Sequence, residues 1–286
     1  MSRSSARSLL AVLASLAGYA LLVPWVGQYL TAEYRRVSIE HPLSYKVLKA
    51  ISLDQRMIVG QFKVAKVVTY YGGRSPEVSQ KFGRDDYFLM FRNLDAAIRL
   101  DPYNIDAYYF AQAALTWEVK EYAAANALLE FGMKYRTWDY LLPFFAAFNY
   151  SYFLKDHANA AVCYRRAAEI SGSDLFMRLA SRSYYESGRT EDAIAYLKVL
   201  ISSSKNEALK QMLVKRLKAL TGVRIIEEAR DLYRNRFGSP PQSVEQLKGS
   251  GVLRRLPVDP YGGAFFIDAE GQVRSTSSFS EGGNRK

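Results

Sequence analysis

The chain has 286 residues, of which 49% are hydrophobic and 14% aromatic. This apolar content excludes a disordered chain, because enough apolar surface exists to offset the entropy lost on folding. The single Cys163 excludes a disulfide scaffold, and two histidines, His41 and His157, are too few for a multi-histidine metal site. The formal net charge of +11 favours an acidic partner or an anionic neighbouring surface.

The N-terminal region contains an uncharged apolar run over residues 9–30, preceded by a basic tail over residues 1–8. A helix rises about 1.5 Å per residue, so this run is about 33 Å long and can cross a hydrocarbon core of about 30 Å. Trp25 and Tyr29 lie near its far end, where aromatic rings favour the membrane interface. The sequence therefore predicts a transmembrane anchor over residues 9–30.

Two alternatives exist for this apolar run. The small residues of Gly18-Tyr19-Ala20, at positions 18 and 20, resemble a signal-peptidase site, but cleavage there would use an apolar region of only about eight residues. A buried core helix is the second alternative. The basic tail favours a cytoplasmic N-terminus, although Arg35 and Arg36 weaken the charge asymmetry. We therefore expect the body of the protein outside the cytoplasm.

Three pairs of helices with related patterns are predicted between residues 104 and 203. In the first helix of each pair, small and apolar residues recur at i, i+3, i+4 and i+7, which places them on one face. These positions are Tyr108, Ala111, Gln112 and Leu115, then Phe144, Ala147, Phe148 and Ser151, then Met177, Ala180, Ser181 and Tyr184. The second helices carry small residues at Ala124, Ala160 and Ala193, which are 36 and 33 residues apart.

This spacing brackets the 34-residue period of tetratricopeptide repeats, and residues 104–203 resemble three such repeats. The family pattern is incomplete at several positions. Gln112, Phe148 and Ser181 stand where the family often has Gly, and Arg136 and Gly172 stand where it often has Pro. The resemblance implies an all-α solenoid of helical hairpins, in which no hairpin can bury its apolar face without a neighbour.

The segments beside the repeats are predicted to cap the stack. Residues 44–103 read as capping helices or a degenerate repeat, with a long helix over residues 44–71 and a partner helix over residues 84–99. After the repeats, residues 205–237 read as two basic helices, over residues 206–220 and 224–237.

The region from residue 205 to residue 255 is strongly basic, with twelve Lys or Arg against five Asp or Glu. A solvated helical face explains this charge, and attraction to anionic lipid or to an acidic partner is the alternative. Nucleic acid is disfavoured as a partner, because the segment has neither a recognised motif nor an aromatic stacking platform.

Residues 238–276 are predicted to form a short helix over residues 244–248 and a small β-hairpin. This segment weakly resembles the C-terminal ends of bacterial pseudopilin-like proteins, over fewer than forty residues. Asp259, Asp268 and Glu270 are explained as turn residues, with a calcium site as the alternative. Residues 277–286 are predicted to be a disordered tail.

The sequence contains no P-loop, HExxH, GxSxG or CxxC motif. His157 falls in a turn and Cys163 in a helix, where both are expected to pack; a Cys–His dyad is the alternative. We therefore predict a protein that is not an enzyme, with no cofactor and no metal site.

The resemblance implies that the first helix of each hairpin lines a peptide-binding groove. Carried over to this chain, the groove residues are Tyr109, Trp117, Asn149, Tyr152, Arg178, Arg182 and Tyr185. Arg178 and Arg182 are one helical turn apart, and with Asn149 they fit the carboxylates of an acidic peptide or a chain terminus. Solvated groove residues or intramolecular ion pairs are the alternative explanation.

The segment after the anchor loosely resembles bacterial inner-membrane tetratricopeptide proteins. This resemblance implies a membrane-anchored scaffold that mediates protein–protein interactions in an envelope assembly, related to pilus formation or secretion. It further implies a single-pass inner-membrane protein with a periplasmic body. A self-associating structural subunit of an envelope complex is the alternative function.

Overall fold

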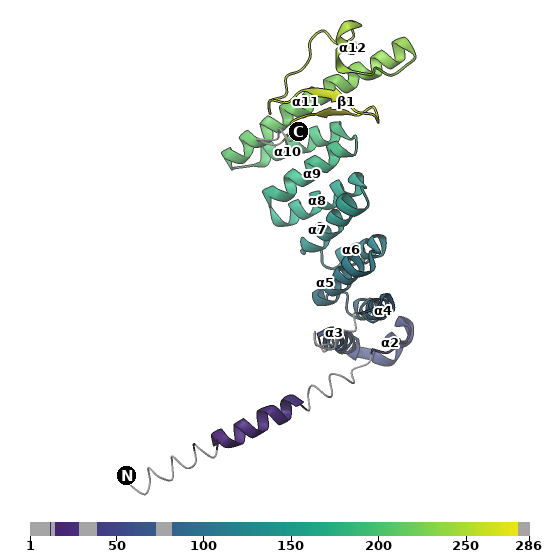
Figure 1. Cartoon of the computed structure of the whole chain (residues 1–286), viewed down its shortest axis with the longest axis vertical. Coiled ribbons are helices and arrows are strands. Elements are labelled where there is room, and N and C mark those ends of the chain that lie inside the picture. The colour runs from purple at the N-terminus through teal and green to yellow at the C-terminus, as the bar shows by residue number, and fades with distance from the viewer. Residues whose placement is uncertain (1–11, 13–14, 29–38, 73–81, 280–286) are drawn as a thin grey trace, which may run out of the picture. The chain divides into compact units, whose positions relative to one another are not determined.

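The computed structural model describes residues 12, 15–28, 39–72 and 82–279 (Figure 1). The described chain is mostly helical, as the all-α prediction requires. It divides into two compact units, Met1–Arg136 and Thr137–Lys286, which we call unit 1 and unit 2. Within each unit, helices that follow one another in the sequence pack against one another.

Residues 12 and 15–28 are helical. Within the described residues, no helix combines the length and the apolar character needed to span a bilayer. The predicted basic tail, and residues 9–11, 13–14 and 29–30 of the predicted anchor, lie outside the described residues.

From residue 39 onward, unit 1 begins with two helices separated by a turn at Leu53. Its described elements are α2 (Tyr45–Ser52), η1 (Leu53–Gln55), α3 (Arg56–Gly72), α4 (Arg84–Leu100), α5 (Ile105–Ala113), η2 (Ala114–Val119) and α6 (Tyr122–Tyr135). The prediction of one long helix over residues 44–71 is wrong, because the chain turns at Leu53, where φ is 45°. The Ser52 hydroxyl donates to the Leu48 carbonyl, a type of bond that bends helices. Leu48, which precedes this turn in α2, packs against Leu100 of α4.

Helices α3 and α4 approach each other closely at Gly60. A Cβ atom on Gly60 would lie 3.2 Å from the Ala97 carbonyl oxygen and 3.3 Å from the Asp101 Cβ. The backbones therefore come together where one helix lacks a side chain. Helix α5 then begins at Asn104, whose side-chain oxygen accepts a hydrogen bond from the Ala107 N–H at 3.2 Å, as an N-cap does.

Unit 2 contains the second and third predicted helix pairs, a long helix and a small sheet. Its described elements are α7 (Leu141–Phe148), η3 (Asn149–Phe153), α8 (His157–Ser171), α9 (Asp174–Glu186), α10 (Thr190–Ser203), α11 (Glu207–Phe237), α12 (Val244–Gly249), β1 (Phe265–Ile267) and β2 (Val273–Ser275). The helices of both units over residues 104–203 fall where the sequence predicts them.

The predicted buried faces are only partly correct. Tyr108, Ala111, Gln112, Leu115, Ala147, Ala180, Ser181 and Tyr184 are buried, whereas Phe144, Phe148, Ser151 and Met177 are half-buried. In α6 the predicted small residue, Ala124, is also half-buried, and its neighbour Ala125 is fully buried instead. The face of α6 that packs inward is therefore displaced by one residue from the predicted face.

Two of the first helices end in a π turn that the sequence did not predict. The element η2 continues α5 and η3 continues α7. Each is followed by a lysine in the left-handed conformation, with φ of 61° at Lys120 and 54° at Lys155. Each also carries an exposed aromatic side chain, Trp117 (57% exposed) or Tyr152 (59% exposed). Because π turns are frequent at functional sites, both rings are candidates for ligand contact.

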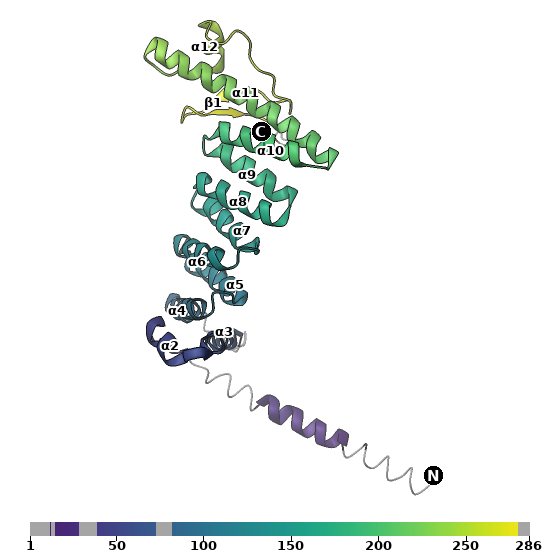
Figure 2. The same cartoon turned by 180° about the vertical axis from the view of Figure 1, so that it is seen from behind.

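Helix α11 is a single unbroken helix (Figure 2). The prediction of two helices here, over residues 206–220 and 224–237, is wrong. Gly222 lies between the two predicted helices, and a glycine disfavours a helix interior by only about 1 kcal/mol relative to Ala. Its missing side chain provides space for a neighbour, because a Cβ would lie 3.0 Å from the Phe265 ring and 3.2 Å from the Pro257 Cβ.

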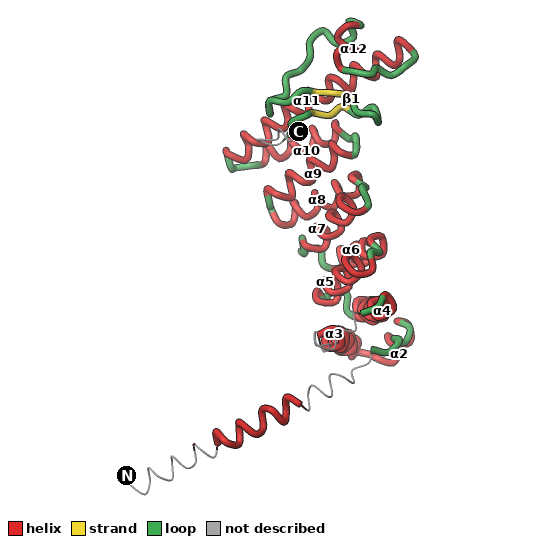
Figure 3. The backbone as a smooth tube through the Cα atoms, in the orientation of Figure 1, coloured by secondary structure: helices red, strands yellow, loops and turns green. Residues whose placement is uncertain are grey.

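The segment after α11 folds back and packs against α9 and α11. Strands β1 and β2 pair antiparallel beside α11, with Phe266 opposite Arg274 (Figure 3). The hairpin predicted for this segment is therefore present, and α12 contains the helix predicted over residues 244–248. The Tyr185 hydroxyl of α9 donates to the Val273 carbonyl of β2 at 2.9 Å.

After the hairpin, Ser277 and Phe279 contact earlier parts of unit 2. Ser275 and Ser277 donate hydroxyl hydrogen bonds to the buried Asp259 carboxylate. Phe279 is buried, and its ring centroid lies 5.2 Å from that of Tyr185. The prediction that residue 277 begins a disordered tail is therefore wrong for residues 277–279, and the remainder of that tail lies outside the described residues.

Replacing Gly222 tests the packing of this segment on α11. Leucine has a higher helix propensity than glycine, but here it would displace Phe265 and Pro257. Gly222→Leu should therefore lower the free energy of unfolding of unit 2 by about 1–3 kcal/mol, as overpacking does. Thr221→Leu changes the adjacent exposed position and should leave stability nearly unchanged. Denaturant unfolding measures both, and equal midpoints would contradict the assigned packing.

Candidate functional site

A hollow of about 540 Å³ opens in unit 2 beside η3, α8 and α9. Two of the predicted groove residues, Tyr152 and Arg182, line this hollow together. Lys155, in the loop after η3, and His157, the first residue of α8, also line it. The hollow therefore combines aromatic surface with the positive charges of Lys155 and Arg182.

The aromatic wall of the hollow comes from the end of α7 and from η3. The rings of Phe148 and Tyr152 are stacked, with centroids 5.4 Å apart and planes 10° apart. The Lys155 ammonium lies 5.3 Å from the centre of the Tyr152 ring, within cation–π distance. Because Tyr152 remains 59% exposed, this wall can contact an extended chain.

The charged side of the hollow is provided by α9. Arg182 Nε lies 3.7 Å from a carboxylate oxygen of Glu186, and the arginine side chain is largely exposed. The other oxygen of Glu186 accepts from Arg274 Nη1 at 2.6 Å. The Glu186 carboxylate is thus shared by two guanidinium groups. An exposed ion pair such as Arg182–Glu186 contributes at most about 1 kcal/mol to the stability of the fold. Arg182 therefore retains capacity to bind an anion.

The floor of the hollow is polar where Ser151 meets Tyr164. Their hydroxyl oxygens are 3.2 Å apart. Burial raises the pKa of Tyr164, and the hydrogen bond with Ser151 and the charge of Arg182 act in the opposite direction. At neutral pH this hydroxyl is consequently protonated. Because Ser151 donates to the Phe148 carbonyl at 3.2 Å, the Tyr164 hydroxyl is the donor in its bond with Ser151.

The remaining predicted groove residues of unit 2 do not join this hollow. Arg178 points toward α11, where its Nη1 lies 3.6 Å from the sulfur of Met212. Asn149 is buried, and Tyr185 is covered by the C-terminal segment. The predicted grouping of Arg178, Arg182 and Asn149 around one carboxylate is therefore not formed.

The two predicted groove residues of unit 1 line separate cavities. Tyr109 borders a hollow of about 580 Å³ together with Asn104 and Asp106. Trp117 borders a smaller cavity of about 140 Å³ among other aromatic rings.

Sequence reasoning missed two charged residues that face the core from α11. Arg216 lies under Phe279, with its Cζ 5.5 Å from the ring centre and Nη1 donating to the Phe279 carbonyl at 3.3 Å. Burial lowers the pKa of Arg216. Glu227 is buried and accepts from the Thr190 hydroxyl at 2.7 Å. Along α11, Arg216 and Glu227 lie three or four residues from members of an apolar series. That spacing predicts a position on the buried face of the helix. The apolar series includes Leu209, Leu213, Leu220 and Val223.

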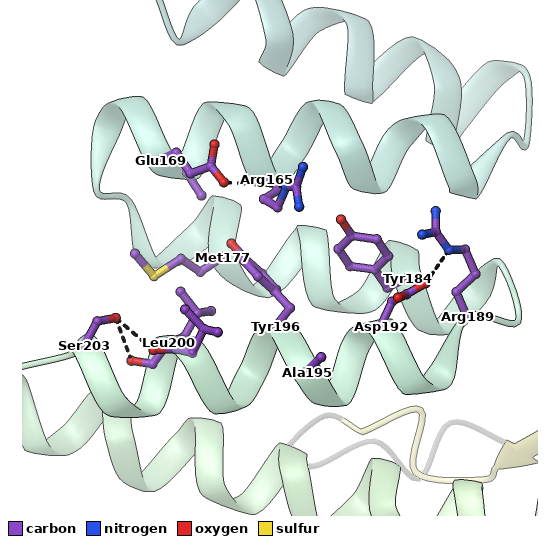
Figure 4. Close-up of a pocket in the computed structure, with 12 residues that line it drawn as sticks. Arg165, Glu169, Met177, Tyr184, Arg189, Asp192, Ala195, Tyr196, Leu200 and Ser203 are labelled. Carbon is purple, nitrogen blue, oxygen red and sulfur yellow. Dashed lines mark hydrogen bonds and ion pairs between the residues drawn. The ribbon is translucent and has the colours of Figure 1, made fainter.

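A second hollow, of about 500 Å³, lies between α8, α9 and α10 (Figure 4). Ion pairs Arg165–Glu169 and Arg189–Asp192 lie at its edges. Tyr196 points into it, and the hydroxyl of Tyr196 is buried without a hydrogen-bond partner among the described residues. Burial raises the pKa of Tyr196 to about 12. None of the predicted groove residues lines this hollow.

Two of the three acidic residues considered for calcium, Asp259 and Asp268, are engaged by other side chains. Asp259 accepts from Ser275 and Ser277, and Asp268 accepts from Arg274 Nε at 3.1 Å. In the part of the chain that the structure describes, no three His, Cys, Asp or Glu side chains group as metal ligands do.

Comparison of the sequence with protein-family models gave no match, and comparison with curated proteins also gave none. The function is therefore inferred from the arrangement of the residues themselves.

The unpartnered hydroxyl of Tyr196 leads to a stability prediction. A buried polar group without a partner carries a desolvation penalty of about 1–3 kcal/mol, so Tyr196→Phe should raise the melting temperature of unit 2. Tyr164→Phe is the matched control: it removes the hydrogen bond with Ser151 and should lower the free energy of unfolding by about 1 kcal/mol. Thermal unfolding followed by circular dichroism measures both, and a lower melting temperature for Tyr196→Phe would contradict this account of the hollow.

Proposed function

We propose that this protein is a membrane-anchored scaffold with tetratricopeptide-like hairpins, which binds partner proteins in a bacterial envelope assembly. The proposal includes a single pass through the inner membrane, a periplasmic body and a pilus- or secretion-related assembly. Support comes from the paired helices over residues 104–203. Further support comes from the fully buried small residues Ala125, Ala160 and Ala193, one in the second helix of each pair.

The observation that carries this proposal is the hollow of unit 2. Its stacked rings offer surface for the apolar parts of a peptide, and Tyr152 is exposed. Arg182 shares the Glu186 carboxylate with another arginine, and Lys155 lies over the Tyr152 ring. Both side chains are therefore positioned to bind the carboxylates of a partner. Arginine and lysine beside aromatic rings suit an acidic peptide or a chain terminus. We therefore assign an acidic segment of a partner protein to this hollow.

The anchor is proposed from the sequence of residues 9–30, which contains no charged residue. A run of about 20 apolar residues is sufficient for a transmembrane helix. The basic tail before it favours a cytoplasmic N-terminus. A body held at the membrane on its outer side would meet its partners at a raised local concentration.

The hollow is tested by charge reversal at two arginines of α9 that are one turn apart. Arg182 lines the hollow and Arg178 does not. Arg182→Glu should remove at least one partner from a crosslinking pull-down of native membranes, because a carboxylate would then face the acidic segment. Arg178→Glu makes the same change in charge outside the hollow and should retain that partner. Identical partner sets for the wild type and Arg182→Glu would exclude the proposed site.

The anchor is tested by fractionation. The full chain should remain in the membrane pellet after alkaline carbonate extraction, and a chain lacking residues 1–32 should appear in the soluble fraction. The N-terminal sequence of the recovered full-length product provides a control. A new terminus near residue 21 would replace the anchor with a cleaved signal peptide.

A further inference from the structure

The small cavity of unit 1 is walled by four aromatic rings from four elements. These are Tyr71 of α3, Tyr87 of α4, Phe110 of α5 and Trp117 of η2, and Glu118 completes the wall. The Tyr71 and Phe110 rings meet edge to face, with centroids 5.2 Å apart and planes at 85°. We call these five residues the unit 1 cage.

The helical path before Trp117 creates the space inside the cage. Phe110, Ala113, Ala114 and Trp117 follow one another at i, i+3, i+4 and i+7, so they lie along one face. The two alanines between the rings leave the cavity open, and both line it. Its volume of about 140 Å³ is below the range of about 300–1,000 Å³ for drug-sized ligands. The cage therefore has room for one side-chain head group.

The charges of the cage favour a cation. The faces of aromatic rings carry negative potential, so rings that surround a cavity attract a positive group. Glu118 contributes a full negative charge at the exposed edge, and no Lys or Arg is among the lining residues. In the surrounding stretch, residues 82–121, there are seven acidic and four basic residues. This local excess of acid is opposite in sign to the net charge of the chain.

Hydrogen bonding indicates which cation fits. Burial, and after it the charge of Glu118, raises the pKa of Tyr87 to about 12. Tyr87 is thus a neutral phenol that lines the cavity beside the Glu118 carboxylate, and both groups carry lone pairs that can accept hydrogen bonds. A primary ammonium group has three N–H donors for such acceptors, whereas a quaternary ammonium has none.

We propose that the unit 1 cage binds the ammonium end of a lysine side chain from a partner protein. The four rings surround the methylene stem and the charge, and Glu118 accepts from the ammonium group. That the lysine comes from a partner protein rests on the proposed scaffold function; the preference for an ammonium cation does not. The site also differs in sign from the hollow of unit 2, which is assigned to an acidic segment.

The experiment uses the full chain in maltoside detergent, labelled with 5-fluorotryptophan. The sequence has three tryptophans, and Trp117→Phe identifies the signal of Trp117 in the fluorine NMR spectrum. Titration with N-acetyl-lysine amide should move that signal saturably and leave the signals of Trp25 and Trp138 unmoved. N-acetyl-norleucine amide has a similar stem without the charge and should bind at least about tenfold more weakly, since cation–π and ionic contacts are lost.

Paired variants separate the charge of the cage from general electrostatics. Glu118→Gln should weaken binding of the lysine derivative by about threefold to tenfold, the expected effect of one exposed charge contact. Glu121→Gln removes the same charge nearby, from a residue paired with Arg84 at 2.8 Å that does not line the cage. It should change the affinity by less than about twofold. Glu118 is exposed, so its replacement leaves the core intact, and unchanged far-ultraviolet circular dichroism confirms this.

Three results would overturn the proposal. Equal binding of the norleucine and lysine derivatives would make the cage a purely apolar cavity. Tighter binding of glycerophosphocholine than of the lysine derivative would assign it to a choline head group instead. Absence of any shift of the Trp117 signal with lysine derivative at high millimolar concentration would exclude a cation site. The Arg182→Glu pull-down involves unit 2 alone, so the two proposals fail separately.

Discussion

A stack of helices always leaves its last apolar face uncovered, and in unit 2 that face is buried by the chain's own C-terminal segment. The contact depends on pairs that are far apart in sequence: Tyr185 with Val273, Arg274 with Glu186, and Phe265 over Gly222. Burying about 100 Å² of apolar surface contributes about 2.5 kcal/mol, so even a small segment stabilises the end of a stack substantially. The same segment also fixes Glu186, and thereby the position of the carboxylate that Arg182 shares.

The helix pairs over residues 104–203 were predictable from sequence, because spacing of apolar residues and short turns are local signals. The small hairpin near the C-terminus was predictable for the same reason. Two features depend on distant partners and were not. Gly222 lies within one continuous helix and packs against Phe265, which is 43 positions later; Phe279 was assigned to a tail because its aromatic neighbours are elsewhere in the chain. The π turns at Trp117 and Tyr152 were not predictable either, because they depend on one additional residue in a helix, for which composition gives no signal.

The candidate site was predictable to a similar degree. The resemblance to tetratricopeptide repeats placed Tyr152 and Arg182 in a groove lined by first helices, and the structure brings both to one hollow. The same resemblance placed Arg178 and Tyr185 there too, but α11 and the C-terminal segment approach α9 on that side. Spacing along one helix cannot report which neighbour covers it. The unit 1 cage was even less predictable, because its rings come from four different elements. Of its residues, only Trp117 was predicted to contact a ligand.

The burial of Glu227 gives unit 2 an unusual response to acid. Burial raises the pKa of Glu227, against the smaller opposing effects of Thr190, Arg230 and Arg224. The folded chain therefore holds this proton more tightly than the unfolded chain does. The resulting contribution to stability is complete below the unfolded pKa and is lost as pH rises through the folded pKa. Most salt-bridged carboxylates weaken a fold when they are protonated, whereas this one strengthens it, so mild acidification would tighten the junction of α10 and α11.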